Sequence, residues 1–156
     1  MNTEKLFKLD YNNEHHLKLL HEFEEREGSF NKIHQKNNKT SQNIITEGLF
    51  LEENDIIKDA CFIEGEKDIK TCNIFFYPLK ENYKNRRLIS LATDYALNIL
   101  NMQVVVIRPE ETDKELISIL QNKGFECLGK DNNTIIFLKE KEEINTIQRK
   151  VSWKHL

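Results

Sequence analysis

Two continuous apolar runs enclose an amphipathic helix pattern near the middle of this chain. The first run covers residues 74–77 and the second covers residues 104–107, while apolar side chains recur every three or four positions over residues 83–101. A continuous apolar run is typical of a strand buried on both faces. A strand–helix–strand sequence joins two parallel strands through a right-handed crossover. The pattern therefore predicts a βαβ unit and, with it, an α/β fold with a mixed sheet.

The other elements are predicted from turn residues and shorter apolar patterns. Tight turns at 54–55 and 64–68 separate three consecutive strands, which indicates an antiparallel meander. A capping box, Thr112-x-x-Glu115, opens a helix that Gly124 ends. The predicted order is a strand at 6–9, a helix at 14–27 stopped by Gly28, a polar loop with at most one short helix at 28–47, strands at 48–53, 56–64 and 69–79, a helix at 83–101, a strand at 103–108, a helix between Thr112 and Gly124, and strands at 125–128 and 133–139.

The size and charge of the chain limit the classes of protein to which it can belong. At 156 residues it has the length of one domain, which we expect over residues 1–140, with a charged tail or peripheral helix over 141–156. A net charge of −3 argues against broad electrostatic binding of nucleic acid. No apolar run approaches the ~18 residues of a membrane span, and the first residues lack the apolar core of a secretion signal. Neither nucleic acid nor a membrane is expected as a partner, and a cytoplasmic location is predicted.

The cysteines and histidines show no pattern of a metal site. Cys61, Cys72 and Cys127 are far apart, and no pair of them has CxxC spacing. The five histidines have no ligand-like spacing with one another or with the cysteines. We therefore predict three buried thiols, no disulfide framework and no metal.

The segment from Leu79 to Leu88, LKENYKNRRL, has the pattern of an anion-binding loop. It lies between a predicted buried strand and a predicted helix, where a helix amino terminus presents unpaired amide donors and partial positive charge. Basic side chains at that position cost about 0.3–1 kcal/mol each unless an anion joins them. Arg86 and Arg87 therefore predict either a bound phosphate or a local ion pair with Glu81.

The order of the predicted elements resembles the fold of the GNAT superfamily of N-acetyltransferases over residues 6–139. Residues 80–92, KENYKNRRLISLA, resemble the family's loop and helix that receive the pyrophosphate of acetyl-CoA, and residues 120–129, LQNKGFECLG, resemble its helix end followed by Gly-Phe and a strand. The resemblance implies acetyl-CoA as co-substrate. It implies that the backbone near Leu79 hydrogen-bonds the pantetheine arm and the acetyl carbonyl. The implied cofactor-binding residues are Leu79, Lys84, Asn85, Arg86, Arg87 and Leu88.

The chain departs from the family pattern at two places. The family loop, Arg/Gln-x-x-Gly-x-Gly/Ala, corresponds to residues 84–89, so Arg87 and Ile89 replace the two small residues. The tyrosine that often serves the family as general acid corresponds to Leu120. Tyr77 and Glu126 are candidates for acid–base roles because their strands are expected to border the cleft, but the catalytic residues are not assigned.

Three interpretations of the function follow. The resemblance implies direct transfer of an acetyl group from acetyl-CoA to a primary amine of a small molecule or peptide, in a protein that can pair as a homodimer through its last strands. The alternative is a catalytically degenerate protein of the same fold that acts as a binding or regulatory module through residues 28–47 or the tail from Lys141, which the two departures favour. The third is an unrelated α+β regulatory domain with an acidic surface.

Overall fold

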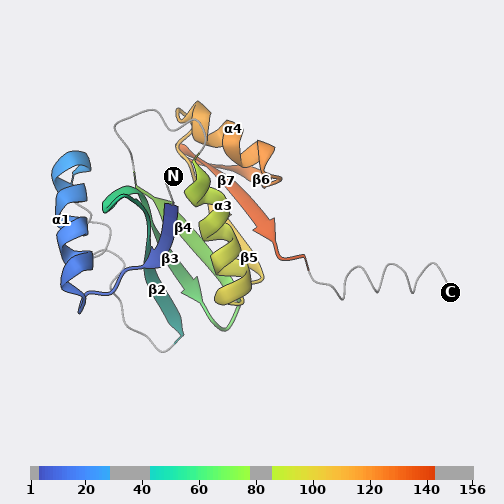
Figure 1. The fold of residues 1–156 in the computed structure, drawn as a ribbon. Helices are drawn as coiled ribbons and strands as arrows, with labels where there is room; N and C mark the ends of the chain where they lie inside the picture. Colours follow the sequence, from blue (N-terminus) through green and yellow to red (C-terminus); the bar gives the residue numbers. More distant parts are fainter. Residues whose placement is uncertain (1–3, 29–42, 78–85, 143–156) are drawn as a thin grey trace.

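A computed structural model describes residues 4–28, 43–77 and 86–142 of the chain, and its centre is a seven-stranded sheet (Figure 1). The strand order is β1-β2-β3-β4-β5-β7-β6. The elements are β1 (Glu4–Lys8), α1 (Glu14–Glu27), β2 (Ile44–Glu53), β3 (Ile56–Glu66), β4 (Thr71–Phe76), α3 (Arg87–Asp94), the π-helix η1 (Tyr95–Ile99), β5 (Val104–Ile107), α4 (Lys114–Asn122), β6 (Glu126–Asp131) and β7 (Thr134–Glu140).

The sheet is mixed, as the sequence predicts. Strands β2, β3 and β4 form the antiparallel meander, and β4 pairs with β5 in parallel across the connection that contains α3. The other strand pairs are antiparallel. The predicted βαβ unit and the α/β fold class are therefore confirmed.

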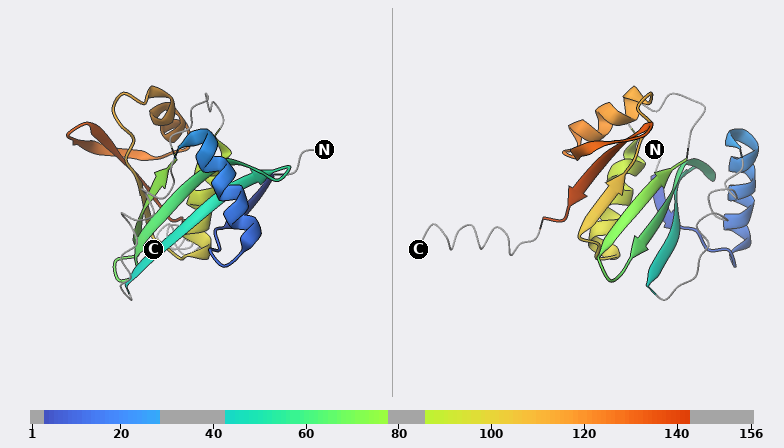
Figure 2. Two further views of the ribbon diagram at one scale, coloured as in Figure 1. Left: turned by 90° about the vertical axis from the view of Figure 1, so that its left-hand side faces the viewer. Right: turned by 180° about the vertical axis from the view of Figure 1, so that it is seen from behind.

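Helices cover the two faces of the sheet unequally, and each covered face has its own apolar core (Figure 2). Helix α1 packs on one face, where its Phe23 meets Phe50 and Phe62 of the sheet. Helices α3 and α4 pack on the other face, where Ile89 and Leu120 join a larger core. In the part of the chain that the structure describes, no helix covers β4, β5 and β7 on the α1 side (Figure 2). Phe75, predicted to be buried within a two-sided apolar run, is for this reason 39% exposed.

The ends of α1 and α4 illustrate one confirmed and one corrected prediction. Helix α1 has the predicted bounds, with the side chain of Asn13 as its amino-terminal cap and Gly28 at a φ of 107° after its last residue. Helix α4 starts one residue later than the predicted capping box implies. Its cap is Asp113 rather than Thr112, because the Asp113 carboxylate accepts the Leu116 N–H at 3.2 Å.

Several strand boundaries differ from prediction because pairing, rather than composition, sets them. Strand β2 begins at Ile44, so the last residues of the predicted polar loop pair with β3. Strand β3 extends to Glu66, and β4 correspondingly begins only at Thr71. Strand β6 continues to Asp131, which shortens the predicted turn before β7.

The predicted helix over residues 83–101 begins at Arg87, because Arg86 precedes it in a non-helical conformation, and residues 83–85 lie outside the described residues. Its second half is the π-helix η1, in which the hydrogen-bonded turn is one residue wider than in an α-helix. The predicted tail lies largely outside the described residues.

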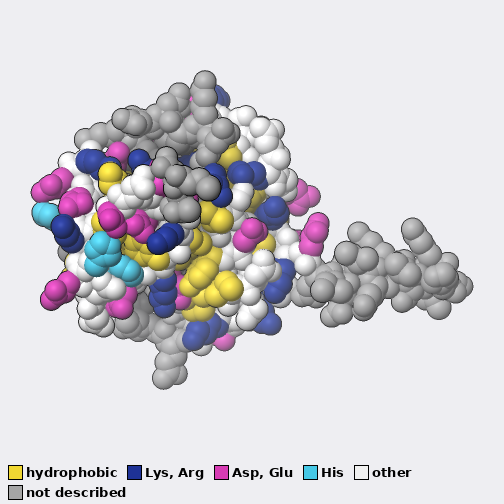
Figure 3. All heavy atoms as spheres, in the orientation of Figure 1, with side chains coloured by type: hydrophobic (Ala, Val, Ile, Leu, Met, Phe, Trp, Pro, Cys, Tyr) yellow, Lys and Arg dark blue, Asp and Glu magenta, His cyan; other side chains and the backbone are white. Residues whose placement is uncertain are grey.

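The cysteine prediction holds for two of three residues. Cys61 and Cys72 are buried, but Cys127 is exposed because β6 is an edge strand. No group of three metal-ligating side chains occurs within residues 4–28, 43–77 and 86–142. None of the described helices is long and apolar enough to cross a membrane. Acidic and basic side chains are interspersed over the face of the molecule shown in Figure 3.

Candidate cofactor site at the diverging strands

Strands β4 and β5 part in the middle of the sheet. Their parallel pairing ends at Asn73 and Val106. Beyond that point β4 stays with β3, where Phe76 pairs with Cys61, and β5 stays with β7. The sheet therefore opens between its two central strands on the side toward the amino end of α3.

The backbone of β4 directs polar groups into this opening. The Tyr77 N–H donates to the Ala60 carbonyl at 3.0 Å, so the peptide groups of Tyr77 face β3. Successive residues of a strand direct their N–H and C=O groups to opposite neighbours. The N–H and C=O of Phe76 therefore face the side from which β5 departs. The sequence prediction placed this backbone role at Leu79, which lies outside the described residues.

The amino end of α3 lies beside the opening and has no capping side chain within the described residues. Arg86 is the residue before the helix, with φ −72° and ψ 89°, and its side chain makes no capping hydrogen bond. The first turn contains no acidic residue. The Ile89 N–H donates to the Arg86 carbonyl at 3.2 Å. The N–H groups of Arg87 and Leu88 thus begin the helix with the partial positive charge that favours an anion.

The Arg86 side chain does not extend outward toward such an anion. Its Nε and Nη2 donate to Oδ2 and Oδ1 of Asp59, both at 2.7 Å, and Nη2 also donates to the Tyr77 carbonyl. The guanidinium lies 5.0 Å from the centre of the Phe76 ring. Asp59 is thus a partner of Arg86 that the sequence did not predict, because a buried guanidinium needs a carboxylate in the interior. Glu81, one of the two predicted partners, lies outside the described residues.

Asp59 is buried on the same face of β3 as the apolar residues below α3. Its exposed fraction is 4%, and its Oδ1 also accepts the Ala60 N–H at 2.8 Å. Burial raises the pKa of Asp59, and the hydrogen bonds and charge of Arg86 oppose that shift. The pair is thus a compact, neutral unit inside the protein.

The side chains that replace the family's small residues lie away from the helix amides. The Arg87 side chain is 63% exposed and pairs with Glu4 of β1, at 2.6 Å between Nη1 and Oε1. Leu88 and Ile89 are fully buried in the core under α3. Neither Arg87 nor Ile89 therefore fills the space in front of the first amides. Lys84 and Asn85, the other predicted binding residues of this loop, lie outside the described residues.

The two candidates for acid–base roles are placed differently from one another. Tyr77 is buried beside the end of β4, its hydroxyl donates to the Gly28 carbonyl, and its ring lies edge-on to Phe23 at 4.9 Å. Burial raises the pKa of Tyr77. Glu126 is exposed on β6, and β7 separates it from β5. Tyr77 thus follows directly after a strand that borders the opening, and its hydroxyl is directed to the α1 side, whereas the strand of Glu126 does not border the opening.

Sequence reasoning missed two polar residues beside the opening. Asn73 stands at the last position at which β4 pairs with β5, and Glu64 of β3 pairs with it on the other side. Both are half-buried. They face the α1 side, because their neighbours Cys72 and Ile63 lie in the core under α3 and successive side chains of a strand point to opposite faces. The sequence signal for these two residues was a polar side chain that alternates with apolar ones along the strand.

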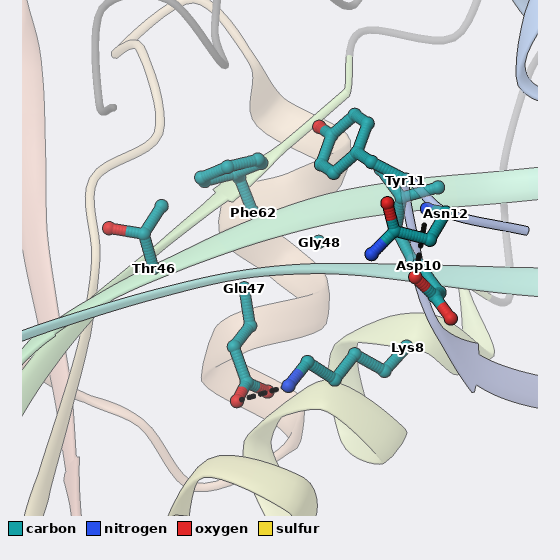
Figure 4. A pocket seen from close by; sticks show the side chains of 9 residues that line it. Lys8, Asp10, Tyr11, Asn12, Thr46, Glu47, Gly48 and Phe62 are labelled. Carbon is teal, nitrogen blue, oxygen red and sulfur yellow. Dashed lines mark hydrogen bonds and ion pairs between the residues drawn. The ribbon is translucent and has the colours of Figure 1, made fainter. Parts of the chain in front are cut away.

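A separate hollow of about 440 Å³ lies where β1 and β2 meet (Figure 4). Phe62, Gly48, Tyr11 and Asn12 are among the residues that line it. On its other side Lys8 pairs with Glu47 at 3.3 Å, and the Tyr95 hydroxyl donates to Glu47 at 2.5 Å. No residue predicted for cofactor binding lines this hollow.

Comparisons with known proteins identify the fold. No family model matches the sequence, and a search of curated proteins found no match. Solved structures do match, and their shared class is the GNAT N-acetyltransferase; the chain therefore has the GNAT fold, which confirms the predicted resemblance at the level of the fold.

Three of these structures show the extent of the similarity. Mutant forms of the spermidine/spermine N-acetyltransferase SpeG from Vibrio cholerae are 14% identical, cover 88% of this chain and 95% of their own, and have a TM-score of 0.64. The N-acetyltransferase PseH from Campylobacter jejuni, in complex with acetyl coenzyme A, is 10% identical, with coverage of 90% and 100% and a TM-score of 0.62. The ribosomal-protein-S18-alanine N-acetyltransferase from Escherichia coli is 12% identical, with coverage of 92% and 98% and a TM-score of 0.60.

Proposed function

We propose that this protein is an N-acetyltransferase that moves an acetyl group from acetyl-CoA to a primary amine. The observation that carries the proposal is the opening between β4 and β5 beside the uncapped amino end of α3. A thioester arm that enters the opening would meet the backbone groups of Phe76, and a diphosphate would meet the amides of Arg87 and Leu88. The structural neighbour PseH binds acetyl coenzyme A, which supports the same donor here.

The proposed reaction can be supported mainly by main-chain groups. The amine nitrogen bonds to the acetyl carbon, the carbon–sulfur bond breaks, and the proton released by the amine ends on the sulfur of CoA. A main-chain N–H at the end of β4 stabilises the oxyanion that forms at the carbonyl. Leu120 is buried in the core, so the family's tyrosine has no counterpart at that position. Of the two predicted acid–base candidates, Tyr77 is the one that follows directly after a strand bordering the opening.

The names of the structural neighbours suggest which amine acceptors to test first. The neighbours act on spermidine and spermine and on the alanine of a ribosomal protein, according to their names. A polyamine and a peptide amino terminus are therefore the first acceptors to test. Pairing as a homodimer stays a prediction that light scattering on the purified protein would check.

One observation favours the alternative of a binding or regulatory module. Arg86 and Arg87, the two described basic residues at the start of α3, are each paired with a carboxylate of the protein itself. The module interpretation predicts no response to CoA. The acetyltransferase interpretation predicts that acetyl-CoA at 100 times its dissociation constant adds about 2.7 kcal/mol to the free energy of unfolding.

A pair of substitutions at residue 87 tests the amide itself. Arg87→Pro removes both the side chain and the N–H at the first helical position, where proline fits, and Arg87→Ala removes the side chain alone. Because a hydrogen bond to a charged group contributes about 1.5–3 kcal/mol, Arg87→Pro should bind acetyl-CoA at least about tenfold more weakly than Arg87→Ala. Calorimetric titration measures both constants. Equal affinities, or no binding by the unmodified protein at millimolar acetyl-CoA, would refute the proposal.

A further inference from the structure

One buried ion pair joins the segments that meet at the amino end of α3. Arg86 and Asp59 are each 4% exposed, and two hydrogen bonds of 2.7 Å connect them. The same guanidinium donates to the carbonyl of Tyr77, directly after β4. A single side chain thus connects β3, the end of β4 and the residue that precedes α3.

This connection is more restrictive than an ordinary surface ion pair. The guanidinium is planar, and its two parallel bonds to one carboxylate fix its orientation as well as its distance. Separating the two charges inside the protein is strongly unfavourable, because each would then be buried without its partner. A displacement of the Arg86 backbone by an ångström would therefore stretch several hydrogen bonds at once. The start of α3 is held in place relative to the end of β4.

We infer that Asp59 and Arg86 are positioning residues for the donor's diphosphate. The inference rests on the proposed function. Asp59 neutralises the charge of Arg86, so the pair acts through the backbone and determines where the amides of Arg87 and Leu88 lie. Phosphate oxygens accept short, directional hydrogen bonds. The affinity for a diphosphate therefore depends on the positions of these two amides, whereas the affinity for a thioester arm lying along β4 does not.

A ligand without phosphates separates this role from general structural support. Acetyl-pantetheine carries the thioester and the arm of acetyl-CoA but lacks its diphosphate. If the pair positions the helix amides, its loss weakens the binding of acetyl-CoA and leaves the binding of acetyl-pantetheine unchanged. If the pair only supports the fold, both ligands lose affinity together.

Two variants of the pair and one control make the comparison. Arg86→Lys keeps the charge but loses the fork that reaches both Asp59 and Tyr77. The double variant Asp59→Leu, Arg86→Met replaces both charges by apolar groups, a change that buried ion pairs often tolerate. The control Glu111→Gln breaks an exposed ion pair with Lys130, 2.5 Å long, which shares no residue with the buried pair. Melting temperatures without ligand establish that each variant is folded.

Dissociation constants for both ligands come from chemical-shift titration, which extends to millimolar affinities. We expect both variants of the pair to bind acetyl-CoA about tenfold more weakly or worse, a loss of about 1.4 kcal/mol. Acetyl-pantetheine should stay within about twofold, and the control should match the unmodified protein. Unchanged acetyl-CoA binding by folded Arg86→Lys, or an equal loss for both ligands, would overturn this inference and leave the proposed function standing. If the unmodified protein bound neither ligand, the proposed function would fail first, and the two failures are thereby distinguishable.

Discussion

Substitution of Arg86 by alanine should be among the most damaging single changes that can be made in this protein. It removes the two N–H groups that bind Asp59 and the contact with the Tyr77 carbonyl. Asp59 is 4% exposed in the wild-type packing. Without Arg86, the remaining hydrogen-bond donor to its carboxylate among the described residues is the Ala60 N–H. Removing one partner of a buried ion pair costs about 3–5 kcal/mol. That loss is a large share of the free energy of unfolding of a domain of this size.

The loss in Arg86→Ala should depend on pH in a defined direction. Burial already raises the pKa of Asp59, and in the variant the opposing contribution of Arg86 is absent. The folded variant therefore binds a proton at Asp59 at pH values where the unfolded chain has released it. In that window stability falls as pH rises, by about 1.4 kcal/mol per pH unit. The difference from the wild type should accordingly shrink as the pH is lowered from 7 toward 5.

Urea denaturation followed by far-ultraviolet circular dichroism at pH 7 and pH 5.5 measures this difference. The matched comparison is the double variant Asp59→Leu, Arg86→Met, which leaves no buried charge and should lie within about 2 kcal/mol of the wild type at both pH values. The reasoning is wrong if Arg86→Ala and the double variant lose equal stability, or if the loss in Arg86→Ala is the same at both pH values.

Two further predictions concern the core under α3. Gly65→Ala should lower the melting temperature, with a cost of about 1–3 kcal/mol, because its new Cβ would lie 3.0 Å from Cε of Met102 and 3.2 Å from Cβ of Cys72; an unchanged melting temperature would show that Met102 moves aside freely. In the folded protein a thiol reagent at pH 8 should modify Cys127 and leave Cys61 and Cys72 intact, since both are buried and burial raises the pKa of Cys72 to about 12. Mass spectrometry after labelling counts the modified thiols, and modification of all three without denaturant would contradict the burial of Cys61 and Cys72.

Local patterns in the sequence were sufficient to predict the frame of the fold. Apolar periodicity and turn residues act within a few positions of one another, which is why the βαβ unit and helix α1 could be derived from the sequence alone. Strand ends were less predictable, because the start of β2 at Ile44 depends on pairing with Glu66 of a different strand. Pairing between strands is a tertiary property that no local pattern fixes.

The partner of Arg86 could not be derived because it comes from a strand 27 residues earlier in the sequence. One signal was nevertheless present. Asp59 alternates with Cys61 and Ile63, so it lies in line with side chains that face the core. A register shift between Leu51 and Glu52 of β2 interrupts the alternation before that point and obscures it. A carboxylate in an apolar row requires a cation in the interior.

The positions of four consecutive side chains explain how the proposed anion site would form without glycine. Glycine is needed only where a side chain would come between an amide and its ligand. Here Leu88 and Ile89 face the core, Arg86 points inward to Asp59, and Arg87 extends outward to Glu4. The side chains of residues 86–89 are thus directed away from the first amides of α3 for reasons of packing rather than composition. The same arrangement neutralises both guanidinium charges, so the proposed binding of a diphosphate at the start of α3 relies on the peptide dipoles of the helix end.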